Sequence, residues 1–445
     1  MWKFRAIANY PAVSHDDTWA LDVLDDLRIV KRYNKTSRYY DEPYLYRFSA
    51  MTAEVLVFDE FMPGVEAGGA SFDASIALCK CAGEAAERFC QATIPAGTFS
   101  HGTFATQAPA LDPDEFRFFS PAQLSSEPFE CLRWDDNSTF YWTEGFDILR
   151  ARSTLLPAQL VYLPYPYRDE HRIAHPSTSG GACAKTFEDS ALSGMLELLE
   201  RDAFMIHYLS QSEGIRIDLK DHALFQEIEE YLSRFDLELH TYLLQTDFPV
   251  CPVMGILIDR SQSGVPAPWM SAGLKCSLDP MRAVLGAIEE ACQTRPWIRR
   301  NLQELDQGIG ASKEERISDI ILDRALYWSN PERRNDLSFL MHSKRSIRFS
   351  DLSPVSSQAS PYGLNTLLSF CRREGHPVYT ADITAPAVRE HGLVVTKVIM
   401  PTLQQFYLHE PHVPLASSRW REVPSRLGLR EDRGGLPNPV PHFFL

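Results

Sequence analysis

The sequence predicts an α+β fold in which mixed β-sheets pack with helices around a single site. The first reason is a recurring unit, in which a glycine-rich turn precedes a helix that carries glutamates and an arginine. The second is a set of short apolar runs, bounded by turn residues, that are typical of strands. The third is the order strand, helix, strand over residues 215–244. Together they indicate that distant parts of the chain converge.

The bulk composition narrows the class of protein. With 445 residues, of which 44% are hydrophobic and 23% charged, the chain is globular and can bury a large core. Its net charge of −15 argues against nucleic-acid binding, which needs a concentrated basic surface. The sequence contains no run of about 18 apolar residues and no signal-peptide core, so we expect a cytoplasmic protein without a membrane span. The nine scattered cysteines are expected to be reduced thiols.

The N-terminal segment, residues 1–66, combines strand-like runs with aromatic and charged loops. Residues 98–128 are rich in Ser, Pro, Gly and Phe and are predicted to form a loop. Apolar and aromatic runs predict strands in the first part of the chain at residues 27–30, 54–58, 140–146 and 160–165.

The first acidic helix is predicted within residues 67–92. It follows the glycine pair that begins at Gly68 and carries Glu84, Glu87 and Arg88. These three side chains share one face because residues three and four positions apart are neighbours on a helix.

The central helix follows a turn rich in Ser, Thr and Gly, and its periodicity is helical from Ser190 onward. Glu188 and Asp189 mark its first turn, where carboxylates suit the positive end of the helix dipole. A narrow polar stripe on this otherwise apolar helix indicates that both of its sides are packed. Buried carboxylates in such a stripe need a positive partner, either an arginine or a divalent ion. The stripe consists of Ser190, Ser193, Glu197, Glu200 and Arg201.

A looser third unit lies within residues 273–298. Gly273 precedes Glu290 by 17 positions, which is the spacing between Gly180 and Glu197, and a helix is predicted over residues 285–298. In the second half of the chain, strands are predicted at residues 237–244, 253–259, 377–383 and 393–399. The glutamates and arginines of the units suit a cage for Mg²⁺ and phosphate, because Mg²⁺ prefers oxygen ligands and guanidinium groups bind phosphate oxygens.

These motifs resemble the YcaO family, in particular the YcaO cyclodehydratases of azole-containing peptide biosynthesis. Residues 193–201 match the pattern Ser-x-x-x-Glu-x-x-Glu-Arg in full, and the first unit matches it with Lys80 in place of the serine. The resemblance extends from about residue 21 to the end of the chain. It implies a YcaO-type fold around one ATP site, with a catalytic domain over residues 67–414.

The resemblance also implies ATP and Mg²⁺ as cofactors. Mg²⁺ would be held by Glu84, Glu87, Glu197 and Glu200. The nucleotide would be bound by Ser193, Arg88, Arg201, Glu289, Glu290, Gln293 and Arg295.

The last segment, residues 415–445, is a proline-rich tail in which Pro437, Pro439 and Pro441 alternate. Many azoline-forming members of the family end on a Pro-x-Pro-x-Pro terminus, whose carboxylate is proposed to reach the active site. Because four more residues follow in this chain, that catalytic role would pass to Leu445 at the end of a longer tail, or be lost.

The resemblance implies an enzyme that uses ATP to phosphorylate backbone amides of a ribosomally made precursor peptide. A Cys, Ser or Thr side chain adds to the preceding carbonyl, the oxyanion takes the γ-phosphoryl group, and phosphate leaves as the azoline forms. Two alternatives stay open. One is thioamide or amidine formation by the same ATP step, and the other is a non-catalytic ATP-binding accessory protein.

The same resemblance also implies partners. The chain begins close to the family domain, so a separate, ThiF-like protein is expected to bind the leader of the precursor peptide. A homodimer is one assembly that the sequence leaves open.

Three further motifs are interpreted as structural. Residues 179–186, SGGACAKT, lack the glycines and the preceding strand of a phosphate loop. His171 and His175 lie four residues apart but have no glutamate between them, and Pro176 favours a loop, so metal binding is not expected. Cys183 has no histidine near it in the sequence and is interpreted as a core thiol.

Overall fold

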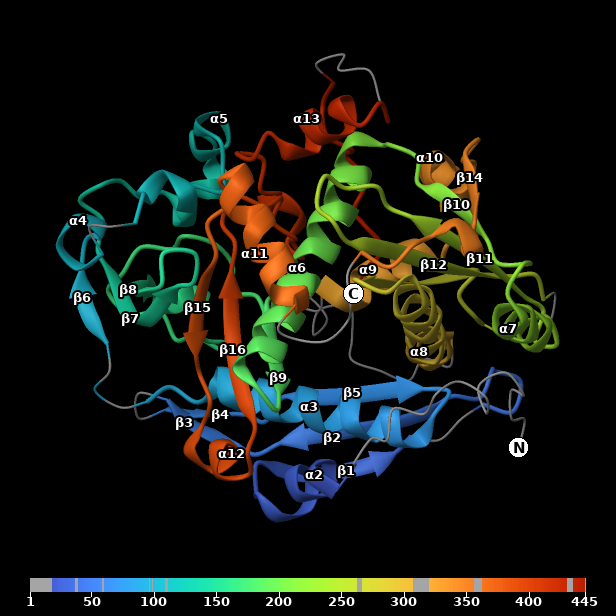
Figure 1. The fold of residues 1–445 in the computed structure, drawn as a ribbon, viewed down its shortest axis with the longest axis horizontal. Coiled ribbons are helices and arrows are strands. Elements are labelled where there is room, and N and C mark those ends of the chain that lie inside the picture. The colour runs from blue at the N-terminus through green and yellow to red at the C-terminus, as the bar shows by residue number, and fades with distance from the viewer. Residues whose placement is uncertain are drawn as a thin grey trace.

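The computed structural model describes residues 18–36, 39–57, 60–95, 97, 99–108, 111–261, 266–306, 320–355, 362–429 and 435–444. It has the α+β architecture that the sequence predicts, with separate β-sheets arranged around a central helix (Figure 1).

The first sheet is antiparallel and has the strand order β1-β2-β5. Its strands are β1 (Val30–Lys35), β2 (Tyr46–Thr52) and β5 (Glu66–Ser71), and α3 (Ala74–Ala92) packs on it. A Cβ atom on Gly69 of β5 would lie 2.2 Å from the carbonyl oxygen of Ala77, so glycine is needed for the helix to approach the strand this closely. The strand predicted at 27–30 begins only at Val30. The sheet also spans the boundary expected at residue 66, so the N-terminal segment is not structurally separate from the domain predicted to begin at residue 67.

The second sheet has the order β13-β12-β11-β10-β14 and is mixed, because only its last pair of strands is parallel. Its long helix, α8 (Pro280–Asp306), packs on β13 and β12, and Gly273 of β13 provides the close approach. The strand-helix-strand order predicted over 215–244 is confirmed, although β10 and β11 are antiparallel. The strands and the helix between them are β10 (Ile215–Asp218), α7 (Ala223–Ser233), β11 (Leu237–Leu243), β12 (Cys251–Asp259), β13 (Met270–Ser277) and β14 (Ser346–Arg348).

The third sheet has the order β6-β7-β15-β16-β9, and β8 pairs with β7. The strand predicted at 160–165 is wrong. Residues 158–160 form a 3-10 turn and the following aromatic residues are buried in a loop, where Pro164 has no N–H to donate to a strand ladder. The strands are β6 (Ser100–Gly102), β7 (Phe140–Asp147), β8 (Arg152–Pro157), β9 (Gly181–Ala184), β15 (Tyr379–Asp382) and β16 (Val394–Ile399).

The central helix, α6 (Phe187–Ser210), joins these parts. It packs against β16 and β9 of the third sheet and against β13 of the second, and Figure 1 shows it running between them above α3. Thr186 caps it by accepting a hydrogen bond from the N–H of Asp189. The prediction that both sides of this helix are packed is therefore confirmed.

The C-terminal segment packs on α6 rather than forming a separate tail. Arg419 of α13 (Arg419–Arg426) pairs with the fully buried Asp202, and Trp420, Phe443 and Phe444 belong to the same core as α6. Trp328, from the region after residue 303, is also buried in this core.

The remaining elements are short or lie at the edges of the molecule. They are α2 (Thr18–Leu21), β3 (Val55–Val57), β4 (Glu60–Met62), α4 (Phe104–Gln107), α5 (Pro121–Leu124), α9 (Ile320–Ser329), α10 (Ser338–Met341), α11 (Tyr362–Glu374) and α12 (Pro386–Glu390), with the 3-10 helices η3 (Glu127–Leu132) and η7 (Glu410–His412) among them. Short elements thus replace much of the loop predicted at 98–128. All nine cysteines are free thiols. Among the described residues, no helix has both the length and the apolar character needed to cross a bilayer.

Candidate functional site

Three strand–helix units contain the same contact. In each, a helix glutamate accepts a hydrogen bond from a backbone N–H that lies 16 or 17 residues earlier. This bond fixes one oxygen of each carboxylate and aims the side chain back along the strand. The pairs are Gly68 with Glu84 (2.9 Å), Gly180 with Glu197 (2.9 Å) and Leu274 with Glu290 (3.1 Å).

In the first two units the other carboxylate oxygen binds the arginine that follows four residues later. Arg88 lies 2.9 Å from Glu84 and Arg201 lies 2.7 Å from Glu197. The Nε atom of Arg88 is buried and has no hydrogen-bond partner among the described residues. Arg201 also donates to the hydroxyl of Ser179. Each guanidinium group is therefore held beside the glutamate of its own helix.

Glu87 lies between the first two units. Burial raises its pKa to about 8, and repulsion from Glu197 and Glu84 adds to the rise. A Cβ atom on Gly181 would lie 2.8 Å from Oε1 of Glu87, so this carboxylate reaches from α3 to β9. The carboxylates of α3 and α6 are thus brought together, although 113 residues separate Glu84 from Glu197.

Glu200 links the central helix to the third unit. Its carboxylate accepts a hydrogen bond from the N–H of Cys276 on β13. Burial raises the pKa of Glu200 and that of Glu290, the latter to about 8, and repulsion from Glu200 is the next contribution to Glu290. Helices α3, α6 and α8 therefore contribute to one acidic cluster, which we call the five-glutamate cluster: Glu84, Glu87, Glu197, Glu200 and Glu290.

Two lysines that the motifs do not include balance this charge. Lys397 of β16 is 3% exposed and donates to the carbonyl oxygen of Ser177 at 2.6 Å. Burial lowers its pKa to about 8, although Glu197 and Glu87 act in the opposite direction. Lys275 of β13 is exposed to solvent on one side. The protein packed around the rest of its side chain lowers its pKa, but the carboxylates of Glu200 and its neighbours outweigh this effect and raise the pKa overall.

A signal for both lysines was present in the sequence. Each is the only charged residue within a buried strand, β16 (VVTKVI) or β13 (MSAGLKCS). A charged side chain inside a buried strand is costly unless opposite charge faces it. The sequence alone could therefore have indicated that carboxylates face these two lysines.

Two other predicted site residues, Gln293 and Ser193, lie near the cluster at its periphery. A Cβ atom on Gly68 would lie 3.7 Å from Nε2 of Gln293, so α8 reaches the start of the first unit. Ser193 is exposed on α6, one turn before Glu197. Both remain compatible with a ligand at the cluster.

Arg295 and Glu289 do not face the cluster, and here the prediction is corrected. Arg295 is 4% exposed, and its Nε, Nη1 and Nη2 atoms donate to Glu42, the carbonyl oxygen of Pro268 and Asp259, so every nitrogen of the guanidinium is held by the protein. Glu289 accepts hydrogen bonds from Ser71 and Phe72. It also pairs with Lys80 at 2.7 Å and so ties α8 to β5 and α3. Lys80 thus replaces the serine of the motif with a structural ion pair.

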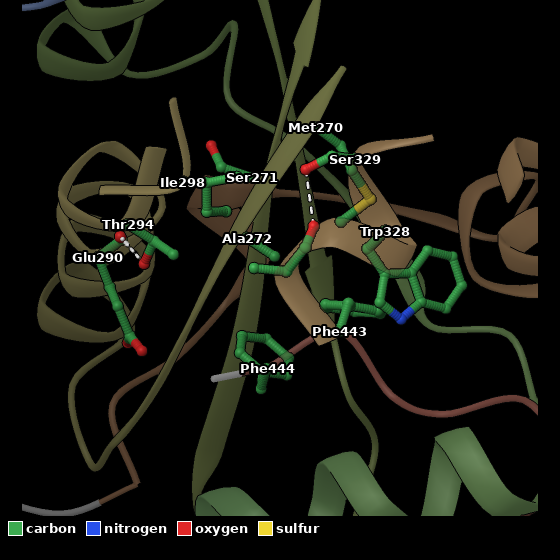
Figure 2. Close-up of a pocket in the computed structure, with 11 residues that line it drawn as sticks. Met270, Ser271, Ala272, Glu290, Thr294, Ile298, Trp328, Ser329, Phe443 and Phe444 are labelled. Atoms are coloured by element: carbon green, nitrogen blue, oxygen red, sulfur yellow. Dashed lines mark hydrogen bonds between the residues drawn. The ribbon is translucent and has the colours of Figure 1, made fainter. Parts of the chain in front are cut away.

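The C-terminal segment ends beside the cluster. Figure 2 shows a pocket with Glu290 and Thr294 of α8 on one side and Trp328 and Ser329 of α9 on the other, with Phe443 and Phe444 at its edge. The carbonyl oxygen of Phe444 accepts a hydrogen bond from Arg324 at 3.1 Å. Leu445 lies outside the described residues.

The sequence model of the YcaO family, described as an ATP- and Mg²⁺-binding YcaO cyclodehydratase, matches residues 68–404. The chain belongs to the YcaO family. Membership confirms the family predicted from the glutamate motifs, with ATP and Mg²⁺ as its cofactors. It supports an ATP-dependent enzyme of the cyclodehydratase type.

Solved structures of a heterocyclase and of a YcaO protein have a similar fold. A heterocyclase in complex with substrate and cofactor superposes with a TM-score of 0.76 at 19% identity, over 94% of this chain and 55% of that one. YcaO from Methanopyrus kandleri, bound with AMPPCP and Mg²⁺, superposes with a TM-score of 0.62 at 18% identity, over 90% of this chain and 94% of that one. At these identities the likeness concerns the fold.

A curated relative is an uncharacterised protein encoded in the tfuA 3′ region of Rhizobium leguminosarum bv. trifolii. It is 28% identical over 204 residues, which are 43% of this chain and 44% of that protein. The chain thus matches about half of the length of this relative and of the heterocyclase.

Proposed function

We propose that this YcaO protein is a cyclodehydratase that converts Cys, Ser or Thr residues of a ribosomally made precursor peptide into azolines. The observation that carries the proposal is the five-glutamate cluster, which three separate helices assemble beside two arginines and two lysines. Phosphoryl transfer depends mainly on positioning and charge neutralisation, and this cluster supplies both.

Glu84, Glu87, Glu197 and Glu200 would hold Mg²⁺. Their oxygen-only donor set suits this ion. The fit rests on Glu87, a buried carboxylate whose charge is opposed by burial and by its acidic neighbours. A divalent cation at this place would remove that cost. Glu84 and Glu197 each accept a hydrogen bond from a backbone N–H through one carboxylate oxygen, and this bond orients their remaining lone pairs.

Arg88 and Arg201 would bind phosphate, with Ser193, Glu290 and Gln293 contacting the nucleotide or the waters of the metal. The buried Nε of Arg88, without a partner among the described residues, is a donor that a phosphate oxygen would satisfy. When bound, ATP supplies the phosphoryl group that makes the amide oxygen of the peptide a leaving group. Lys397 and Lys275 neutralise the glutamates in the free protein. Once Mg²⁺ is bound to the glutamates, the two lysines would offset the negative charge of the phosphates.

The carboxylate of Leu445 is proposed to act as the catalytic base. Phe444 lies in the pocket that Glu290 lines, and Arg324 holds its carbonyl oxygen. These contacts of the preceding residue support the proposal. Removing Leu445 moves the terminal carboxylate by one residue and is expected to lower peptide modification while leaving ATP binding intact.

The precursor peptide and a leader-binding protein are proposed as partners. The heterocyclase of similar fold is nearly twice as long as the part that matches this chain. A separate ThiF-like protein would supply leader recognition.

The experiment that tests this function is incubation of the protein with ATP, Mg²⁺, the short peptide encoded beside its gene and the neighbouring partner protein. Mass spectrometry should show the loss of one water per modified residue, and ATP turnover should require the peptide. Replacement of oxygen by sulfur would identify thioamide formation instead. A protein that modifies nothing and turns over no ATP under these conditions would be an accessory protein.

Mg²⁺ affinity is expected to rise with pH up to about 8. The carboxyls of Glu87 and Glu290 have pKa values of about 8, against an ordinary value of 4.5, so protons compete with the metal below pH 8. Between these two values the folded protein holds protons that the unfolded chain has released, so without Mg²⁺ its stability falls as pH rises.

Calorimetric titration with Mg²⁺ in buffers of different ionisation heat measures both the affinity and the protons released. We expect affinity to change by up to about tenfold per pH unit for each proton displaced. An affinity that stays constant between about pH 6 and 8, with no proton release, would contradict the assignment of Glu87 to the metal and of Glu290 to its surroundings.

A further inference from the structure

Three histidines meet outside the candidate site. His175 lies in the loop before β9, whereas His409 and His412 lie at the 3-10 helix η7, more than 230 residues later. One ring nitrogen of each lies within 4.8 Å of the others. In the sequence His175 lies four residues after His171, but its neighbours in space come from the far end of the chain.

The rings are arranged around a common centre. Their centroids are 4.8, 4.8 and 4.6 Å apart, and their planes differ by only 8° to 19°. The Nε2 atom of His175 lies 2.6 Å from Nδ1 of His412, so these two rings meet edge to edge. Two nitrogens bound to one Zn²⁺ stand roughly 3.3 Å apart in a tetrahedral site, so a small outward movement would admit the ion.

A backbone contact sets the tautomer of His412. Its Nε2 atom bonds the carbonyl oxygen of Pro128, which follows the start of η3. Because a carbonyl can only accept, Nε2 carries the proton and Nδ1 presents its lone pair to His175. A ligand histidine is usually fixed in this way, by donating its other ring N–H to a carbonyl.

His409 contributes an available nitrogen. Its Nδ1 atom is buried and has no hydrogen-bond partner among the described residues. A ring nitrogen without a hydrogen-bond partner can present its lone pair to a metal ion.

We propose that His175, His409 and His412 form a transition-metal site that takes Zn²⁺, separate from the Mg²⁺ of the glutamates. Three imidazoles without a carboxylate suit Zn²⁺ and disfavour Mg²⁺ or Ca²⁺, which require oxygen ligands. A water molecule would complete the coordination.

The three histidines join two segments of the chain. Both segments contact cationic side chains, Arg201 and Lys397, that lie beside the five-glutamate cluster. Two residues after His175, the carbonyl oxygen of Ser177 binds Lys397, and Ser179 of the same turn binds Arg201. On the other segment, the ring of Phe406 lies under the guanidinium of Arg201, with 5.0 Å between the ring centroid and Cζ of the arginine. A bound ion would hold these segments together, but its binding does not depend on the reaction that the protein performs.

The test uses the full chain, prepared without a histidine tag and stripped with a chelator. Zn²⁺ titration against a chromophoric chelator should show one tight site per chain that Mg²⁺ does not fill. Co²⁺ should give the visible absorption of a four-coordinate site. Loss of any one ligand, in His175→Ala, His409→Ala or His412→Ala, should weaken binding about 100-fold, at least as much as loss of an outer contact does.

His171→Ala is the matched control, since His171 lies in the same loop with its side chain exposed. It should bind Zn²⁺ as tightly as the unchanged protein. Equal loss in this control, or unchanged binding in all three ligand variants, would show adventitious binding by surface histidines and overturn the proposal. Zn²⁺ should also raise the melting temperature of the unchanged protein. If the unchanged protein binds no Zn²⁺ tightly, the proposal is overturned whatever the variants show.

Discussion

Glu197→Gln and Glu200→Gln are each expected to lower ATP turnover by about 10²–10³-fold, which is the cost of removing one preorganised electrostatic contact from a transition state. Both residues lie on the polar stripe of α6, and both keep a backbone N–H as a fixed partner. The amide of glutamine can still accept that hydrogen bond. The substitution therefore removes the negative charge needed by Mg²⁺ while leaving the side chain in place.

Steady-state ATP turnover with peptide and partner measures this loss, and circular dichroism with thermal unfolding checks the fold. Glu188→Gln is the matched control, because Glu188 lies in the first turn of the same helix and is exposed. It should keep full activity. Turnover within about twofold of the unchanged protein in both site variants would remove α6 from the metal site.

The central helix and the strands of the second sheet could be predicted because their patterns are local. The stripe from Ser193 to Arg201 has helical spacing, and the runs that became β11 and β12 are apolar and bounded by turn residues. The run at 160–165 has the same apolar and aromatic composition. It is buried as a loop, and burial alone does not specify a strand.

The acidic cluster could be predicted because its motif repeats, whereas contacts between distant segments could not. Arg295 has the residue type and position of a phosphate ligand, but Glu42, 253 residues earlier, occupies its guanidinium. His175 and His412 are 237 residues apart and meet only in the folded chain. Spacing within one segment, which excluded a metal at His171 and His175, carries no information about such partners.

Arg295→Met is expected to destabilise the fold by about 3–5 kcal/mol, the usual cost of removing one partner from a buried ion pair. Its guanidinium neutralises Glu42 and Asp259, whose side chains are 2% and 8% exposed. Methionine fills part of the volume but leaves these carboxylates without this partner. Arg299 also pairs with Glu42, so Asp259 is the carboxylate that loses most. Urea unfolding followed by tryptophan fluorescence measures the change in the free energy of unfolding.

The structural role and the phosphate-binding role of Arg295 predict different outcomes. Arg300→Met is the control on the same helix, because its pair with Glu304 is exposed and should contribute at most about 0.5 kcal/mol. If Arg295 is structural, the Arg295 variant that is still folded at low temperature should bind ATP with unchanged affinity. A variant of normal stability whose KM for ATP rises at least about tenfold would return Arg295 to the nucleotide site, and would mean that its three contacts in the folded chain give way when the nucleotide binds.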